Sequence, residues 1–334
     1  MTIKDIARLS GYAVGTVSRV LNGSPNVSEA AKRKIEAVVK ENNFTLNNNA
    51  KHLKQQASSG IAVIVKGTQN MLFASIVEQL QYLIREKGYS CRIYYIDEDA
   101  SEVDQAIRLC RERRPYGILF LGSNLDEFRK HFSVISIPCV LVTNSAADLD
   151  FPNLSSVSTD DAAGAQHAVE HLISLGHTKI GILSGKMEIS NAAYTRYNGC
   201  LRAFEAHNID FDPKHHLATA RFAMSSGYDA MTALLNRMPD LTAVFAMSDV
   251  MAMGAIRAIR DQGLRVPEDI SIIGYDGIEM CRFMTPKLTT IRQHRETIAT
   301  RSLDILLQCI QDGASAVHEI TPFELIQGES TQTL

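Results

Sequence analysis

The sequence predicts a small all-α head at the N-terminus, followed by an α/β body of two lobes whose parallel sheets are covered by helices. Three observations carry this prediction. Residues 3–39 place apolar side chains at helical spacing, interrupted by glycine. From residue 61 onward, short aliphatic runs alternate with amphipathic helical stretches, and this series occurs twice. A chain of 334 residues is also too long for one compact core.

Three short helices are predicted in the head. Gly11 supplies a turn after the first helix, and the Ser28 hydroxyl can cap the third. The apolar residues assigned to the three helices are Ile3, Ile6, Ala7 and Leu9; Val14, Val17, Val20 and Leu21; and Ala31, Ile35, Val38 and Val39. Three such helices, with a glycine turn between the first two, describe a helix-turn-helix, which places its second helix in the DNA major groove.

Charge favours the same interpretation of the head. Residues 1–57 hold nine Lys and Arg against four Asp and Glu, whereas the rest of the chain holds 25 against 33. A basic unit on an acidic chain is expected of a nucleic-acid-binding head. The excess is modest, so a chance fluctuation stays open as the alternative. On the outward face, Thr16 and Ser18 hydroxyls suit phosphates, and Arg19 suits guanine edges.

A secretory leader is the competing interpretation of the first residues, since Lys4 and Arg8 precede the apolar stretch 9–17. Gly11 and Gly15 interrupt that stretch, Asp5 lies in what should be a basic region, and no small-x-small cleavage site follows before residue 19. The DNA-binding interpretation explains more residues.

Buried parallel strands are predicted in the body. The strands of the first series are residues 61–65, 90–96, 116–122 and 138–143, with helices at 73–87 and 101–114. Those of the second are residues 179–185, 241–247 and 270–276, with helices at 194–207, 226–236 and 250–262. Continuous apolar strands between helices indicate sheets covered on both faces. Three segments that close the chain are expected to cross back between the lobes: residues 288–294, 295–311 and 323–330.

These elements predict three regions: a helix-turn-helix domain at residues 1–46, a linker or hinge helix at 47–59, and a body at 60–334. The body divides into an N-lobe of about 60–159 and 292–322 and a C-lobe of about 160–291 and 323–334. The linker is polar and rich in Asn and Gln, as in a solvated segment. The spacing of Ala50, Leu53 and Ala57 alternatively predicts a short, marginal helix.

Composition argues against several other classes. No apolar run approaches the roughly 20 residues of a membrane-spanning helix. The six cysteines lie far apart without a Cys-x-x-Cys pair, which fits a reducing cytosol and neither a disulfide framework nor a zinc site. No Ser-His-Asp order, P-loop or dinucleotide-binding glycine motif is apparent. A cytoplasmic protein that is not an enzyme, without metal or cofactor, is therefore predicted.

The head sequence "TIKDIARLSGYAVGTVSRVLNGSPNVSEAAKRKIEAVVKENNF" resembles the head of the lac-repressor (LacI/GalR) family of bacterial transcription regulators. The body is similar to the same family at "HLISLGHTKIGILSG", "SDVMAMGAIRAI", "VPEDISIIGYD" and "PKLTTIRQ". The resemblance implies a periplasmic-binding-protein-like body, a homodimer on operator DNA, and a sugar, polyol or sugar acid effector held between the lobes. It implies a repressor of a carbohydrate-utilisation operon.

By this resemblance, Val14, Gly15 and Arg19 meet base edges, and Leu53 enters the minor groove beside its twofold mate. An ordinary apolar linker residue is the alternative for Leu53. The full set of expected DNA-binding residues is Val14, Gly15, Thr16, Ser18, Arg19, Asn22, Ala50 and Leu53. The sequence departs from the family pattern at Tyr12-Ala13, where valine and a capping serine are usual, and at Leu46, where the hinge has proline. Loss of a Ser cap costs about 1 kcal/mol.

For the effector pocket, Arg196 and Asp276 are the strongest candidates, because a donor fork and a bidentate acceptor suit vicinal hydroxyls. Phe73 and Phe222 match aromatic pocket positions of the family, with core packing as the alternative. Weaker candidates are Asn144, Ser190 and Asp249, with helix capping as the alternative for Asp249. Serine at 190, where purine-binding relatives carry arginine, disfavours a purine effector.

Lys66 follows the first predicted strand of the body and has two interpretations. It neutralises an acidic effector, or it is a solvated lysine at the end of a strand, which we favour.

Two runner-up functions remain. A periplasmic-type solute-binding protein would share the two-lobed body. A zinc hydrolase is the second, because "HAVEH" at residues 167–171 fits a zinc-protease pattern. The stripe Ala165, Val169 and Leu172 favours an ordinary covering helix there.

Overall fold

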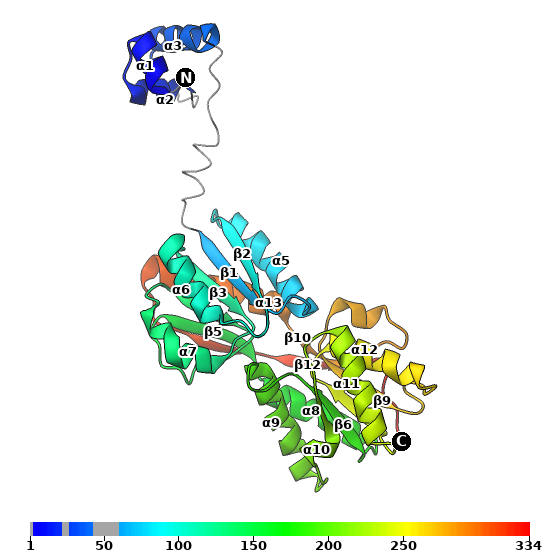
Figure 1. The fold of residues 1–334 in the computed structure, drawn as a ribbon. Helices are drawn as coiled ribbons and strands as arrows, with labels where there is room; N and C mark the ends of the chain where they lie inside the picture. The colour runs from blue at the N-terminus through cyan, green and yellow to red at the C-terminus, as the bar shows by residue number, and fades with distance from the viewer. Residues whose placement is uncertain (1–2, 22–26, 43–59) are drawn as a thin grey trace. The chain divides into compact units, whose positions relative to one another are not determined.

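The computed structural model describes residues 3–21, 27–42 and 60–334. The chain forms two units, Met1–Ser58 and Ser59–Leu334. Figure 1 shows the helical head and the two-lobed α/β body. Both agree with the predicted fold class.

The head is built from α1 (Ile3–Ser10), α2 (Val14–Leu21) and α3 (Glu29–Glu41), which enclose a small apolar core. Gly11 has φ +73° and forms the turn between α1 and α2. The Ser28 hydroxyl accepts a hydrogen bond from the Ala31 amide at 3.4 Å and so caps α3, as predicted. The buried apolar residues of this core are Ile6, Ala7, Val17, Val20 and Ile35.

Two residues assigned to the core of the head lie outside it. Leu9 is 50% exposed and Val14 is 42% exposed. The buried face of α1 runs through Ile6, Ala7 and Ser10, so Leu9 falls beside it. Val14 opens α2 one turn before Val17, the first residue of that helix to reach the core.

The body contains two sheets of six strands with matching orders. The N-lobe sheet has the order β11-β5-β4-β3-β1-β2, and all its pairs are parallel. Its strands are β1 (Ile61–Lys66), β2 (Cys91–Ile96), β3 (Gly117–Leu121), β4 (Cys139–Val142), β5 (Leu154–Thr159) and β11 (His318–Thr321). The C-lobe sheet has the order β12-β10-β9-β8-β6-β7, and only β12 is antiparallel to its neighbour. Its strands are β6 (Ile180–Ser184), β7 (Leu217–Thr219), β8 (Ala243–Ala246), β9 (Ser271–Asp276), β10 (Thr289–Gln293) and β12 (Phe323–Ile326).

Helices cover both faces of each sheet (Figure 1). In the N-lobe, one face packs against α5 (Met71–Glu86) and α13 (Arg295–Asp312), and the other against α6 (Glu102–Glu112) and α7 (Leu125–His131). In the C-lobe, α8 (Asp161–Ser174) and α9 (Asn191–Ala206) pack against one face. The other face packs against α11 (Met224–Arg237) and α12 (Asp249–Asp261), while the one-turn α10 (Pro213–His216) precedes β7.

The chain passes between the lobes three times, and these crossings touch one another. They are the links from β5 to α8, from β10 to α13 and from β11 to β12. The Thr159 hydroxyl donates to Gln293 Oε1 at 3.0 Å and lies 3.4 Å from the Thr321 hydroxyl. One residue from each crossing therefore belongs to a single buried hydrogen-bonded group.

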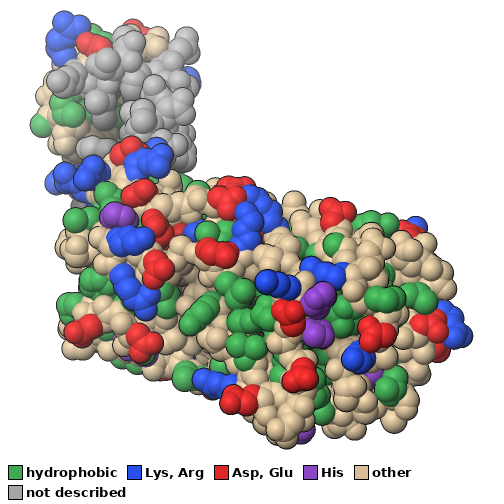
Figure 2. Space-filling view, turned by 60° about the horizontal axis from the view of Figure 1, so that its bottom comes forward, with side chains coloured by type: hydrophobic (Ala, Val, Ile, Leu, Met, Phe, Trp, Pro, Cys, Tyr) green, Lys and Arg blue, Asp and Glu red, His purple; other side chains and the backbone are tan. Residues whose placement is uncertain are grey.

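Positive and negative side chains are mixed on the face of the body seen in Figure 2, where Lys and Arg lie beside Asp and Glu. The acidic excess of the body therefore forms no single-sign patch on this face. Within the residues that the structure describes, no helix is both long and apolar enough to cross a bilayer.

Candidate functional site

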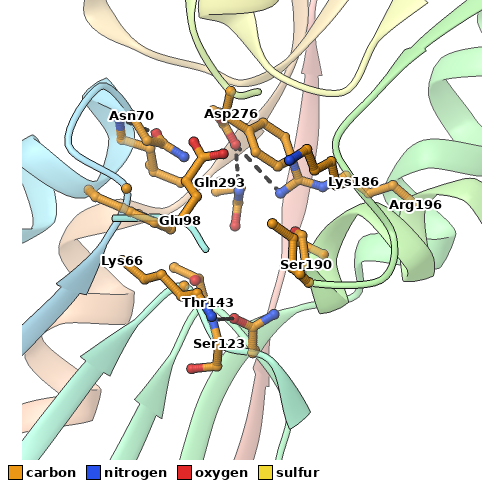
Figure 3. A pocket seen from close by; sticks show the side chains of 18 residues that line it. Lys66, Asn70, Glu98, Ser123, Thr143, Lys186, Ser190, Arg196, Asp276 and Gln293 are labelled. Atoms are coloured by element: carbon orange, nitrogen blue, oxygen red, sulfur yellow. Dashed lines mark hydrogen bonds and ion pairs between the residues drawn. The ribbon is translucent and has the colours of Figure 1, made fainter. Parts of the chain in front are cut away.

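A pocket lies between the two lobes at the carboxyl ends of their strands, where ligands bind in open α/β sheets (Figure 3). It encloses about 680 Å³ of free space, part of it open to solvent. Six of the seven expected effector residues line it: Phe73, Asn144, Ser190, Arg196, Phe222 and Asp276. Further polar residues on its wall are Lys66, Asn70, Glu98, Ser123, Thr143, Lys186 and Gln293.

Arg196 projects from α9 toward several hydrogen-bond acceptors. Its Nε donates to Asp161 Oδ1 at 2.8 Å, and its Nη2 lies 3.5 Å from Asp276 Oδ1. The guanidinium carbon is 3.8 Å from the centre of the Tyr275 ring, a cation–π contact. Burial alone would lower the pKa of Arg196, but Asp161 and Asp276 raise it, so the side chain stays charged.

Asp276 ends β9 with φ +115°, a backbone conformation that residues other than glycine rarely adopt. Thr143 follows β4, the matching strand of the N-lobe, and has φ +79°. Strained backbone of this kind costs about 1–3 kcal/mol per residue and clusters at functional sites. Both strained residues line the pocket.

Buried donors without partners lie on the N-lobe wall. Asn144 Oδ1 accepts a hydrogen bond from the Ser123 amide at 3.1 Å. Asn144 Nδ2 and Ser123 Oγ are buried, and neither has a hydrogen-bond partner among the described residues. An unsatisfied buried polar group costs about 1–3 kcal/mol. Ligand hydroxyls would relieve that cost.

Lys66 is not the solvated lysine that the sequence predicts. It is 8% exposed, and its Nζ lies 2.7 Å from Glu102 Oε2. The other oxygen of Glu102 accepts from the Asn124 amide at 2.6 Å. The end of β1 faces the interior of the cleft, where an unpaired charge is costly, and the first residue of α6 supplies the opposite charge there.

Asp249 does not line the pocket, contrary to the expectation. Its Oδ2 accepts from the Ile278 amide at 2.8 Å, and its Oδ1 accepts from the Thr290 hydroxyl at 2.6 Å. It does not cap α12 either, because Ser248 is the N-cap residue. The carboxylate instead braces the turn after β9, and this turn follows Asp276 directly.

Charged side chains join the lobes at the mouth of the pocket. Arg221 of the C-lobe lies 3.1 Å from Asp97 and also pairs with Asp99, both in the loop after β2. Lys186 Nζ lies 3.4 Å from the same Asp99. These groups are exposed to solvent, which screens their charges, so each pair contributes little to stability. We call this group of four residues the cross-lobe clasp.

Body stability is expected to fall as pH rises from about 5 to about 8. Burial raises the pKa of Asp276 to about 8 and that of Asp249 to about 6, above the ordinary 3.8. Folding that raises a carboxyl pKa is favoured by protonation, so the contribution is full below the ordinary pKa and is lost as pH passes the folded value. Thermal melting measured at several pH values across this range checks whether stability falls as the pH rises. Asp276→Asn should flatten the dependence, whereas the exposed control Asp240→Asn should not; equal profiles would contradict the assignment.

Five of the residues expected to bind DNA lie on α2 (Val14–Leu21). Val14, Gly15 and Arg19 are exposed, and Thr16 and Ser18 are half-buried. Four further positions of interest, Asn22, Leu46, Ala50 and Leu53, lie outside the described residues.

Comparison with known proteins decides the family. The model described as bacterial regulatory proteins, lacI family, matches residues 2–47, and a periplasmic binding protein-like domain matches residues 169–331. The chain is 34% identical over 335 residues to the HTH-type transcriptional regulator MalR of Clostridium butyricum, covering 99% of both chains. This chain belongs to the lacI family.

Other lacI-family proteins match over nearly the same length. The ribose operon repressor of Haemophilus influenzae (strain ATCC 51907 / DSM 11121 / KW20 / Rd) is 33% identical over 312 residues, covering 93% of this chain and 92% of the relative. A crystal structure of the lac repressor dimer, bound to operator and the anti-inducer ONPF, is 28% identical with a TM-score of 0.77, covering 99% of both chains. The protein is thus a DNA-binding transcription regulator, and it works in the cytoplasm, where the DNA of bacteria lies.

The lacI-family head of this chain begins its second helix without a serine cap. The Ala13 carbonyl accepts from the Thr16 and Val17 amides at 2.9 and 3.1 Å. Tyr12 packs against the core of the head, and Lys34 Nζ lies 5.9 Å from its ring centre. Tyr12 therefore contributes packing at the point where the family pattern has a smaller apolar residue.

The histidines of "HAVEH" are engaged with the end of the chain. His171 Nε2 lies 3.3 Å from the Thr331 hydroxyl, and the rings of His167 and Phe323 are 6.1 Å apart. Within the described residues, no group of three or more His, Cys, Asp or Glu side chains is arranged to hold a metal ion.

Several pocket residues of this lacI-family chain were missed by sequence reasoning. Ser123, Thr143 and Lys186 come within two residues of the ends of β3, β4 and β6. Glu98 follows β2 by two residues, and Gln293 ends β10. Polar side chains just after predicted parallel strands were the available signal, since those ends face the ligand crevice.

Proposed function

We propose that this regulator is a repressor of a carbohydrate-utilisation operon, and that a sugar-like effector in the pocket between the lobes controls its operator affinity. The observation that carries the proposal is the buried pair of Arg196 and Asp276, which faces donors on Ser123 and Asn144 that have no hydrogen-bond partner among the described residues. Such a set of fixed donors and acceptors suits a ligand with several hydroxyls. The similarity to a ribose operon repressor supports the carbohydrate class.

We propose a contact with the effector for each of the six expected residues that line the pocket. Arg196 donates to effector hydroxyls and Asp276 accepts from them, because both retain atoms toward the pocket. Phe73 and Phe222 lie against the apolar face of a sugar ring. Asn144 and Ser190 complete the hydrogen bonds. We assign no catalytic residue.

For DNA recognition we propose the exposed surface of α2. Val14, Gly15 and Arg19 meet base edges, and Thr16 and Ser18 hold phosphates. Asn22, Ala50 and Leu53 are proposed with them from the family pattern alone. A homodimer presents two such heads to a near-palindromic operator, in the manner of the lac repressor dimer bound to operator.

Coupling between the two sites is proposed to run through Gln293. Its Nε2 donates to Asp276 Oδ1 at 2.9 Å, and its Oε1 accepts from Thr159. An effector that binds Asp276 therefore acts on the side chain that links the crossings. A change in lobe angle at those crossings would bias operator binding, which is a coupling free energy between two sites.

The runner-up, a periplasmic-type solute-binding protein, accounts for the body alone. It gives no role to the lacI-family head, whose family model matches residues 2–47.

Arg196→Lys is expected to abolish the response to effector while operator binding stays within about twofold of the wild type. Lysine keeps the charge beside Asp161 and Asp276 but loses the planar donor fork. Gel shifts with the upstream DNA of the gene, with and without a sugar panel, measure both properties. The control is Arg202→Ala, an exposed change on the same helix. Equal effector sensitivity in Arg196→Lys would refute the pocket assignment.

A further inference from the structure

Lys66 is one of three cations that line the pocket, and a carboxylate of the protein itself neutralises it. Lys66 and Glu102 are both buried, with 2.7 Å between Nζ and Oε2. At that distance in a medium of low dielectric the two charges attract strongly, and removing either leaves the other uncompensated. Lys66 therefore has no spare charge to offer an anionic ligand.

The other two cations are also paired. Arg196 faces two carboxylates, with 2.8 Å to Asp161 and 3.5 Å to Asp276. Lys186 lies 3.4 Å from Asp99 in the cross-lobe clasp. Every Lys and Arg that lines the pocket thus already has an acidic partner in the protein.

One acid of the pocket forms no salt bridge within the described residues. Glu98 lines the pocket, and the charge of Arg221 in the cross-lobe clasp acts on it without a direct ion pair. With Glu98 and the whole cross-lobe clasp included, six carboxylates (Asp97, Asp99, Glu98, Glu102, Asp161 and Asp276) lie among four cations (Lys66, Lys186, Arg196 and Arg221).

The remaining polar groups are neutral. Asn70, Ser123, Thr143, Asn144, Ser190 and Gln293 bring amides and hydroxyls to the wall. Of these, Ser123 Oγ and Asn144 Nδ2 are the buried groups that lack partners among the described residues. Neutral donors of this kind match the hydroxyls of a ligand. They carry no positive charge that could balance the negative charge of a buried acidic ligand.

We propose that the pocket admits hydroxyl-rich effectors that are uncharged or carry an amine, and rejects sugar acids and sugar phosphates. This inference rests on the sugar-like effector of the proposed function and narrows its chemical class. An acidic ligand would have to displace Glu102 from Lys66, or an aspartate from Arg196, or lie beside the carboxylate of Glu98. Like charges brought together in this way lower affinity steeply.

A panel of ligands matched in shape and differing in charge tests the proposal. It contains glucose and galactose, each with its 2-amino sugar, uronic acid and 6-phosphate, together with ribose and ribose 5-phosphate. Binding to the full-length protein is measured by thermal shift and then by calorimetry at constant ionic strength. We expect the neutral or amino member of a responding series to bind about a hundredfold tighter than its acidic counterparts.

The outcomes separate this inference from the function on which it rests. An acidic member that binds tighter than its neutral counterpart overturns the inference and leaves the sugar-responsive regulator standing. A panel in which no member binds overturns the sugar-like effector itself, and the inference with it.

Glu102→Gln tests the specific part played by the Lys66 pair. Glutamine preserves the shape and an acceptor for the Asn124 amide, and it releases the charge of Lys66. The preference for neutral over acidic members should narrow by about tenfold. Glu112→Gln, an exposed change at the other end of α6, is the matched control and should keep the wild-type preference. A folded Glu102→Gln variant with unchanged preference would show that this pair does not set the charge class.

Discussion

Gly254→Ala is expected to destabilise the body. The same substitution in a helix with free space around the glycine stabilises that helix by about 0.5–1 kcal/mol. A Cβ at position 254 would lie 1.9 Å from the Met224 carbonyl oxygen, which belongs to the backbone of α11. At the facing position, a Cβ on Gly227 would lie 2.5 Å from the Met251 carbonyl oxygen of α12. The two helices cross at these glycines, so an added methyl group must push the backbones apart.

Overpacking of this kind costs about 1–3 kcal/mol, and Gly254→Val should cost more or prevent folding of the body. Urea unfolding followed by circular dichroism measures the change. The control is Gly15→Ala in α2, where a Cβ meets nothing within 4 Å, so the stability of the head should rise slightly. A rise in body stability on Gly254→Ala would contradict the close approach of α11 and α12.

Lys66→Met is expected to destabilise the body by about 3–5 kcal/mol, the usual cost of removing one partner from a buried ion pair. Glu102 would remain buried with its negative charge uncompensated, since its other hydrogen-bond partner in the described part of the chain is the neutral Asn124 amide. The double variant Lys66→Met/Glu102→Gln should recover most of the loss, because the stranded charge is then absent.

Denaturant unfolding of the two single variants and the double variant gives the coupling energy between the positions. Lys87→Met, an exposed change just after α5, is the matched control and should shift stability by less than about 0.5 kcal/mol. Additive losses in the double variant would mean that Lys66 stabilises the body by packing rather than through Glu102.

The sequence predicts the architecture where apolar periodicity is strong, and fails where strands are polar. β5, with the sequence LSSVST, is fully buried and was not predicted. Its hydroxyls are satisfied by neighbours that no local pattern reveals: Ser156 Oγ lies 2.9 Å from His318 Nδ1, and Ser155 Oγ accepts from the Val317 amide at 3.1 Å. The partner segment lies about 160 residues away in the chain. The short strands β7 and β11 were missed as well.

The same limit applies to the pocket. Arg196 and Asp276 could be selected because their residue types suit hydroxyls and because the family pattern marks them. The burial and ion pairing of Lys66 could not be predicted, because they depend on Glu102. That residue is 36 positions later in the chain and reaches the site only when α6 packs beside β1. Asp249 was a weaker pocket candidate with helix capping as its alternative, and its carboxylate instead accepts a hydrogen bond from the Ile278 amide in the turn after β9.

The matching strand orders of the two sheets have a consequence for how a ligand is held. Reading outward from β2 and from β7, the strands of the two lobes follow in the same succession, and Thr143 and Asp276 come at corresponding strand ends. The binding site is therefore an internal pseudo-dimer: two halves of similar plan close on one small molecule from opposite sides. The halves differ in chemistry, since one offers a hydroxyl where the other offers a carboxylate. That difference breaks the symmetry, so even a nearly symmetrical ligand should enter in a single orientation.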